Sequence, residues 1–97
     1  MPQIAWRSQA QDDLGEIFRH VFQFQPQAAW RLRDTIMRQV ELLAAHPALG
    51  RPGRVPGTRE LVVPSTPHIV AYTFDARHDV VQVLAVIHGA RLWPADF

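Results

Sequence analysis

The sequence predicts an α+β fold in which a helical hairpin packs on one face of a mainly antiparallel β-sheet. Two long stretches in the first half of the chain carry apolar residues at helical spacing. Three short runs rich in β-branched residues follow in the last forty residues. Short spacers of turn-forming residues separate these runs, which is typical of a meander. The length of 97 residues indicates one domain, taken as residues 1–97.

The first predicted helix follows a short strand candidate at Gln3–Trp6. Ser8 is a good N-cap residue, and Gln11 three positions later completes a capping box. Apolar residues then recur at helical spacing, which predicts a helix over about Ser8–Phe24. Gly15 lies inside this pattern and costs about 1 kcal/mol relative to alanine.

The second predicted helix covers about Pro26–Ala45. Pro26 suits the first turn of a helix, and the proline after His46 disfavours helix at that residue. Since only Gln25 and Pro26 interrupt the two apolar stripes, we expect an antiparallel helical hairpin. The stretch His46–Gly57 holds three prolines and three glycines, which predicts an irregular crossing loop.

The three predicted strands are Thr58–Val63, His68–Phe74 and Val80–His88. The last is almost continuously apolar, so we expect it to be central or covered on both faces. The sequence does not indicate where the first strand, Gln3–Trp6, joins the sheet.

One face of the middle strand is expected to remain exposed, because the hairpin covers only one side of the sheet. Alternation places Ile69, Ala71 and Thr73 on one face and the side chains between them on the other. The expected exposed set is Val70, Tyr72 and Phe74, with some of Leu84 and Val86. An exposed apolar patch on a small monomer marks a partner site. Two alternatives stay open: the faces are swapped, or the tail with Trp93 and Phe97 folds over the patch.

Composition excludes several functional classes. The chain has no cysteine, which excludes a disulfide framework or thiolate metal site and mildly favours a reducing cytoplasm. A net charge of +1 is low for a protein that grips duplex nucleic acid through many phosphates. No apolar run approaches the roughly 20 residues of a membrane span, and the N-terminus lacks a signal-peptide layout. Neither a P-loop nor a metal motif is present, so we expect no cofactor and no metal.

His88 is the strongest candidate for chemistry. It ends the most apolar strand, and Arg91 follows shortly after. An imidazole beside a guanidinium can act as general acid or base at a phosphoryl transition state. Tyr72, Arg59 and His68 would lie nearby if the strands pair in register. The same groups could equally form a polar rim that holds the C-terminal tail by hydrogen bonds.

Four segments, in this order, resemble the RelE/ParE superfamily of toxins from bacterial toxin–antitoxin pairs. They are LGRPG at 49–53, GTRELVV at 57–63, IVAY at 69–72 and VLAVIHGARLWP at 83–94. The order strand, helical hairpin, Pro/Gly loop, three-strand meander also matches, so the resemblance covers nearly the whole chain. It implies the β-α-α-β-β-β arrangement and a cytoplasmic protein.

The resemblance also implies a cognate antitoxin, whose otherwise disordered C-terminal segment wraps the toxin. Strand addition and helix-in-groove docking are the plausible modes. The residues expected to contact the antitoxin come from the hairpin, the strand face described above and the tail. They are Trp30, Met37, Val70, Tyr72, Phe74, Leu84 and Trp93.

The superfamily splits by target. ParE-like members act on DNA gyrase, and RelE-like members are ribosome-dependent messenger RNA endonucleases. RelE-like members often carry an arginine where this chain has Ile69. They also tend to end with a catalytic tyrosine or histidine near the last strand, whereas here Gly89 follows His88. These departures favour the ParE-like interpretation. A member that binds antitoxin without toxicity is a third possibility.

Two further sets of residues are expected to be functional. The residues expected to contact the target are Arg51, Arg54, Arg59 and Arg91. The catalytic residues, if the chain is a nuclease, are His88, Arg91, Arg59 and Tyr72.

Overall fold

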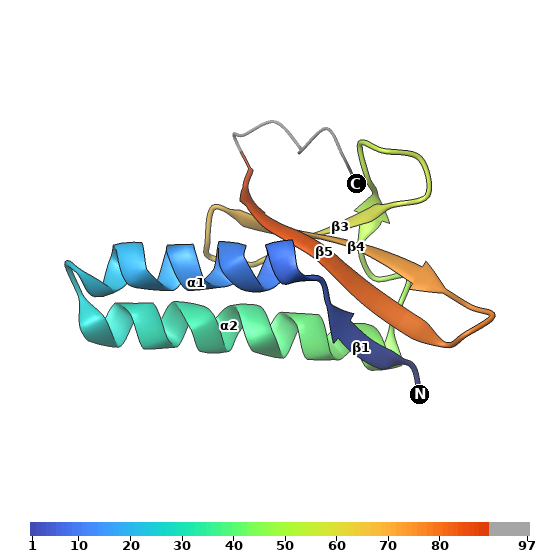
Figure 1. The fold of residues 1–97 in the computed structure, drawn as a ribbon, viewed down its shortest axis with the longest axis horizontal. Helices are drawn as coiled ribbons and strands as arrows, with labels where there is room; N and C mark the ends of the chain where they lie inside the picture. The colour runs from blue at the N-terminus through green and yellow to red at the C-terminus, as the bar shows by residue number, and fades with distance from the viewer. Residues whose placement is uncertain (90–97) are drawn as a thin grey trace.

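Two antiparallel helices lie against a twisted sheet in the computed structural model, which describes residues 1–89 (Figure 1). The elements of this part of the chain are β1 (Gln3–Trp6), α1 (Ser8–Phe22), α2 (Pro26–Ala45), β2 (Arg51–Pro52), β3 (Arg59–Val62), β4 (His68–Asp75) and β5 (Val80–His88). The predicted α+β class, the hairpin and the β-α-α-β-β-β order are confirmed. The structure adds one short strand, β2, inside the stretch predicted as an irregular loop.

The described strands form one sheet in the order β1-β5-β4-β3-β2. The neighbours β5, β4, β3 and β2 pair antiparallel, as the meander predicted. β1 pairs parallel to β5, because the helical hairpin returns the chain across the sheet before the meander begins. β5 therefore lies between β1 and β4, and its prediction as an interior strand is confirmed.

The start of α1 differs from the predicted capping box. Arg7 occupies the N-cap position without a side-chain cap, and Ser8 is already helical. The Gln11 side-chain amide donates instead to the carbonyl of Trp6, at 3.3 Å. α1 also ends at Phe22, two residues before the predicted end.

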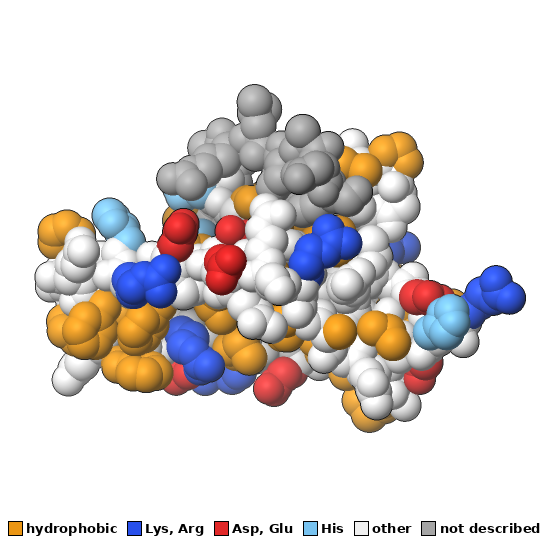
Figure 2. All heavy atoms as spheres, viewed as in Figure 1, with side chains coloured by type: hydrophobic (Ala, Val, Ile, Leu, Met, Phe, Trp, Pro, Cys, Tyr) orange, Lys and Arg blue, Asp and Glu red, His pale blue; other side chains and the backbone are white. Residues whose placement is uncertain are grey.

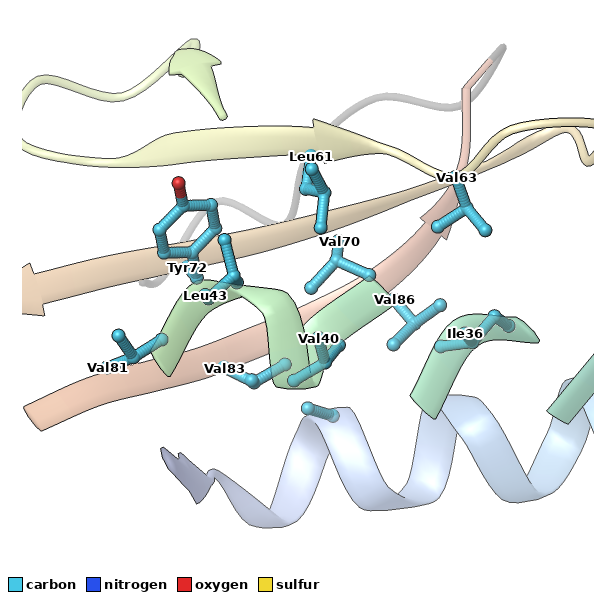
Figure 3. Close-up of a cluster of buried hydrophobic side chains, with 11 residues drawn as sticks. Ile36, Val40, Leu43, Leu61, Val63, Val70, Tyr72, Val81, Val83 and Val86 are labelled. Atoms are coloured by element: carbon cyan, nitrogen blue, oxygen red, sulfur yellow. The ribbon is translucent and has the colours of Figure 1, made fainter. Parts of the chain in front are cut away.

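The core lies between the hairpin and the sheet (Figure 3). Ile36, Val40 and Leu43 recur every three or four residues along α2, so they share one face and are fully buried. They meet side chains from three strands and from the residue that follows β3. These are Leu61, Val63, Val70, Tyr72, Val81, Val83 and Val86.

The predicted facing of the middle strand is wrong. Val70 and Tyr72 point towards the helices and have no exposed surface, and Leu84 and Val86 are also buried. Both faces of β4 are apolar, so alternation alone could not assign them. Among the residues predicted to be exposed, only Phe74 is open to solvent, with 37% of its surface exposed.

The face of the sheet away from the hairpin is buried as well. Its apolar cluster comprises Ile69, Ala71, Leu84, Ala85 and Ile87. A β-bulge explains why neighbouring residues share this face. Ala71 pairs with Ala85 while Tyr72 pairs with Val83, so Leu84 is an extra residue in β5. The single exposed apolar sheet face expected from the sequence is therefore not present among residues 1–89.

Candidate functional site

Two grooves flank α1, and we call the first the hairpin groove. It lies between α1 and α2 and has a volume of about 370 Å³. Its lining is Trp6, Gln11, Leu14, Gly15, Phe18, Trp30, Arg33 and Met37. The Phe18 and Trp30 rings meet edge to face, with centroids 4.7 Å apart. Trp30 remains 53% exposed, so the groove presents an aromatic surface to a partner.

Hydrophobic side chains continue from the groove to the turn of the hairpin. Phe22 and Phe24 are exposed there, and Figure 2 shows apolar side chains gathered at this end of the molecule. The structure thus brings together two predicted antitoxin contacts, Trp30 and Met37. It does not expose Val70, Tyr72 or Leu84, so these side chains offer no surface to a partner in this state.

The second groove, the strand-end groove, lies on the other flank of α1, against the ends of β4 and β5. Its volume is about 730 Å³. Its apolar lining is Ile17, Val21, Leu32, Pro67, Val86 and Ile87, and its polar lining is Gln9, Asp13, Glu16, His20, His68 and His88. His68 and His88 are paired across the two strands, and their ring centroids are 6.0 Å apart.

Asp13 connects α1 to the sheet in this groove. The backbone N–H of Val86 donates to the Asp13 carboxylate at 3.0 Å, just past the point where β1 stops pairing with β5. Burial raises the pKa of Asp13, and the Val86 hydrogen bond acts in the opposite direction. Apart from a carboxylate early in a helix, no pattern in the sequence indicates this contact.

The residues proposed for catalysis do not form one site. Arg59 pairs with Tyr72 in the sheet, whereas His88 pairs with His68. Tyr72 and His68 are four residues apart on β4, which corresponds to about 13 Å along a strand. The expected convergence on His88 is therefore confirmed for His68 and wrong for Arg59 and Tyr72. Arg91 and Trp93 lie outside the described residues.

The hydrogen bonds of Tyr72 indicate a structural role for this side chain. Its hydroxyl donates to the carbonyl of Pro47 at 2.8 Å and accepts the N–H of Gly50 at 2.8 Å. A β-carbon on Gly50 would lie 2.7 Å from this hydroxyl, so the loop approaches the ring as closely as glycine permits. Burial raises the pKa of Tyr72. Because its proton is donated to the carbonyl of Pro47, the phenol is poorly placed for proton transfer.

Arg59 holds the same loop. Its guanidinium donates to the carbonyl of Gly50 at 2.7 Å and reaches that of Ala48 at 3.5 Å. The two loop contacts of Arg59 and the two of Tyr72 thus converge on residues 47–50. This pair fixes the crossing loop to the sheet.

Glu60 holds Arg51 and Arg54, two of the predicted target-binding arginines, and no pattern in the sequence predicted this role. Its carboxylate is buried on β3 and accepts from Arg51 Nε at 2.6 Å, while Arg54 Nε lies 3.7 Å away. The guanidinium-bearing side chains of Arg51 and Arg54 remain 58% and 41% exposed. The Arg51–Glu60 pair depends on β2, which the sequence did not predict. We call Arg51, Arg54 and Glu60 the arginine cluster.

Within residues 1–89, no group of three or more histidine and acidic side chains is arranged to hold a metal ion. In the same part of the chain, neither helix is long and apolar enough to cross a membrane.

Comparison with known proteins identifies the family. Residues 4–93 match the family model described as the ParE toxin of the type II toxin–antitoxin system parDE. The toxin candidate Y4kP of Sinorhizobium fredii is 38% identical, over 94% of this chain and 92% of that protein. Toxin RelE2 of Caulobacter vibrioides is 30% identical, over 95% of this chain and all of that protein.

Solved structures agree with this assignment. A chain of the chromosomal ParDE system from P. aeruginosa superposes with a TM-score of 0.80 at 27% identity, covering 91% of this chain and 96% of that one. The intact E. coli RelBE complex contains a chain with the same fold, with a TM-score of 0.71 at 12% identity, covering 94% and 100%. The chain therefore belongs to the ParE toxin family of type II toxin–antitoxin systems, within the RelE/ParE superfamily that its motifs predicted.

Proposed function

We propose that this toxin inhibits DNA gyrase by protein contact and carries out no chemistry of its own. The main support for this proposal is that the side chains of Tyr72 and Arg59 already form hydrogen bonds within the fold. Both side chains bind backbone groups of residues 47–50, and neither lies beside the His68–His88 pair. A general acid or base must reach the reacting proton, and these two side chains are committed elsewhere.

The arginine cluster is the proposed contact with the target, together with Arg59 and Arg91. Arg51 and Arg54 are held by a buried carboxylate, so they lose less side-chain entropy on binding than free arginines would. Planar guanidinium groups suit bidentate contacts with carboxylates on a protein surface. Inhibition by such contact requires no cofactor.

A cognate antitoxin neutralises the toxin in the cytoplasm by docking its otherwise disordered C-terminal segment on the hairpin. Trp30 and Met37 in the hairpin groove are the proposed contacts, with Phe74 and Trp93 as further candidates. Large exposed aromatic side chains dominate the energetics of such interfaces. Docking of an amphipathic helix in an apolar groove accounts for binding without an exposed sheet face.

The decisive experiment titrates purified toxin into DNA gyrase acting on relaxed plasmid. We expect supercoiling to be lost and cleaved gyrase–DNA complexes to accumulate, with topoisomerase I relaxation unchanged as the matched control. Unaltered supercoiling at saturating toxin would contradict the proposal. Normal growth when the toxin is expressed without antitoxin would instead support the non-toxic alternative.

The His68–His88 pair in the strand-end groove favours one alternative, a RelE-like ribosome-dependent endoribonuclease. Primer extension on messenger RNA after induction tests it. Codon-phased cuts that vanish in His88→Ala would support the nuclease. No cuts at a toxin level that stops growth would support gyrase as the target.

A further inference from the structure

Glu60 is a buried carboxylate whose charge the fold itself does not require. It lies on β3 with 5% of its surface exposed. Its Oε1 accepts from Arg51 Nε at 2.6 Å, whereas its Oε2 is buried and has no hydrogen-bond partner among residues 1–89. A buried ion pair generally adds little stability over a well-packed uncharged residue, because desolvation of the charges offsets their attraction. The reason for a carboxylate at this position therefore lies outside packing.

Arg54 links this carboxylate to the end of β5. Its Nε lies 3.7 Å from Glu60 Oε2, and its Nη2 donates to the carbonyl of Gly89 at 3.4 Å. Gly89 directly follows β5, and its N–H donates at 2.7 Å to the carbonyl of Pro67, the residue before β4. The residue that follows β5 is thus held from two sides, and one of these contacts comes from the Glu60–Arg54 pair.

Both of these Arg54 contacts are long. Charge-assisted hydrogen bonds from a guanidinium to an oxygen are about 2.7–2.9 Å, so Arg54 lies between these two acceptors and closes on neither. Arginine suits such a bridge, because its planar guanidinium carries donors that point in different directions. A lysine ammonium keeps the positive charge but concentrates its donors at one point. Exchange of Arg54 for lysine therefore separates the bridge from the charge.

The bridge gathers the proposed target contacts on one surface. The side chains of Arg51 and Arg54 remain 58% and 41% exposed near β2, at the edge of the sheet. Arg91 is two residues beyond Gly89 in the sequence, which is a span of at most about 7 Å. These three guanidinium groups are positive, whereas the negative charge of Glu60 is buried. The charge that the arginines present to a partner is therefore positive.

We propose that Glu60 is a positioning residue for target binding, and that the surface bound is an acidic patch on the target protein. The carboxylate orients Arg51 directly, and through Arg54 it sets the position of Gly89, where the segment with Arg91 begins. The arginines then meet the target in a fixed arrangement, so less side-chain freedom is lost on binding. Carboxylates of the target accept from these guanidinium forks. This inference rests on the proposed inhibition of gyrase, and it adds the residue that orders the contact and the chemical class of the surface.

The experiment measures two quantities for the full-length toxin, the concentration that halves gyrase supercoiling and the melting temperature. Glu60→Gln should raise the half-inhibitory concentration about tenfold, because the neutral amide no longer attracts both arginines. Its melting temperature should stay within about 4 °C of wild type, because the arginines that lose the carboxylate are exposed and no buried charge is left unpaired. A residue with only a structural role would not separate the two quantities.

Arg54→Lys tests the bridge without a change of charge. It should weaken inhibition about tenfold at an unchanged melting temperature, because lysine cannot span Glu60 and Gly89 together. Arg77→Lys is the matched control, since Arg77 is exposed in the turn before β5 and is not part of the arginine cluster. Arg91→Ala should weaken inhibition about tenfold in wild-type toxin but less than about threefold in the Arg54→Lys background, because the link that places the segment is already lost there.

Direct binding of the toxin to gyrase without DNA tests the class of partner. The affinity should fall as the salt concentration rises, because salt screens exposed charges. Binding that does not depend on salt would overturn the acidic patch. Toxin that binds DNA alone but not gyrase alone would assign the arginines to phosphate groups, and would also overturn this inference.

The remaining outcomes separate this inference from the proposed function. Gyrase that is unaffected by wild-type toxin would overturn the proposed function itself. Full inhibition by both Glu60→Gln and Arg54→Lys would overturn only the positioning role. Full inhibition by Arg54→Lys, with a fall of more than about 8 °C in the melting temperature of Glu60→Gln, would make Glu60 purely structural and would also overturn that role.

Discussion

At the scale of single residues, Tyr72 shows how a buried polar group can hold a loop. It is the only tyrosine in the chain, so its ionisation can be followed by ultraviolet absorbance without interference. Burial raises its pKa, and the folded state therefore favours the neutral phenol. Stability from this group is fully present below the ordinary tyrosine pKa of about 10 and is lost as the pH rises through the folded value.

We expect two measurements on Tyr72 to agree. The absorbance midpoint should lie above about 10 in folded toxin and return to about 10 in denaturant. Tyr72→Phe should lose about 1–3 kcal/mol of unfolding free energy, because the N–H of Gly50 and the carbonyl of Pro47 lose their shared partner. Folded Tyr72→Phe toxin should still inhibit gyrase. A Tyr72→Phe variant with normal stability but no toxicity would contradict this prediction and indicate that Tyr72 acts directly in the function.

At the scale of elements, sequence periodicity predicted the hairpin and the three strands of the meander within a few residues. Periodicity failed where the pairing between strands decides which residues are buried or whether a strand forms. The bulge at Leu84 shifts alternation within β5, and no local signal marks it. β2 forms only because Arg51 and Pro52 pair with Glu60 and Arg59 across a loop. The arginine cluster was therefore predicted as separate side chains and not as a site held by Glu60.

The crossing loop gives a prediction at this scale. Gly50→Ala would place a β-carbon 2.7 Å from the Tyr72 ring and 2.9 Å from the carbonyl of Glu60. Since neither neighbour can retreat, we expect a loss of about 1–3 kcal/mol in urea unfolding, with faster proteolysis in the loop. Gly57→Ala is the matched comparison. Its β-carbon meets nothing, but its φ of +85° disfavours alanine by about 1 kcal/mol. Equal costs at the two sites would contradict the packing argument.

At the scale of the whole molecule, the resemblance predicted the family correctly, whereas the location of the partner surface could not follow from strand alternation. Both faces of the sheet centre are buried. The exposed apolar surface lies instead on the hairpin, and the arginine cluster lies at the β2 edge of the sheet, opposite β1 (Figure 1). Helical periodicity identified Trp30 on the flank of its stripe, but only the packing of α1 on α2 shows that it lines a groove.

The separation of these two surfaces predicts that neutralisation and toxicity can be removed independently. Trp30→Ala should weaken antitoxin binding by about 2 kcal/mol or more, as loss of a large aromatic contact does at an interface centre, and should leave gyrase inhibition unchanged. Arg51→Glu with Arg54→Glu should abolish inhibition while antitoxin affinity stays within about threefold. The buried carboxylate of Glu60 would lose both arginine partners in that double variant, so the melting temperature of the variant must be measured. Arg77→Glu, in the exposed turn before β5, serves as the charge control. Loss of both antitoxin binding and gyrase inhibition in every folded variant would mean that the antitoxin and the target share one surface. The antitoxin would then act by direct competition.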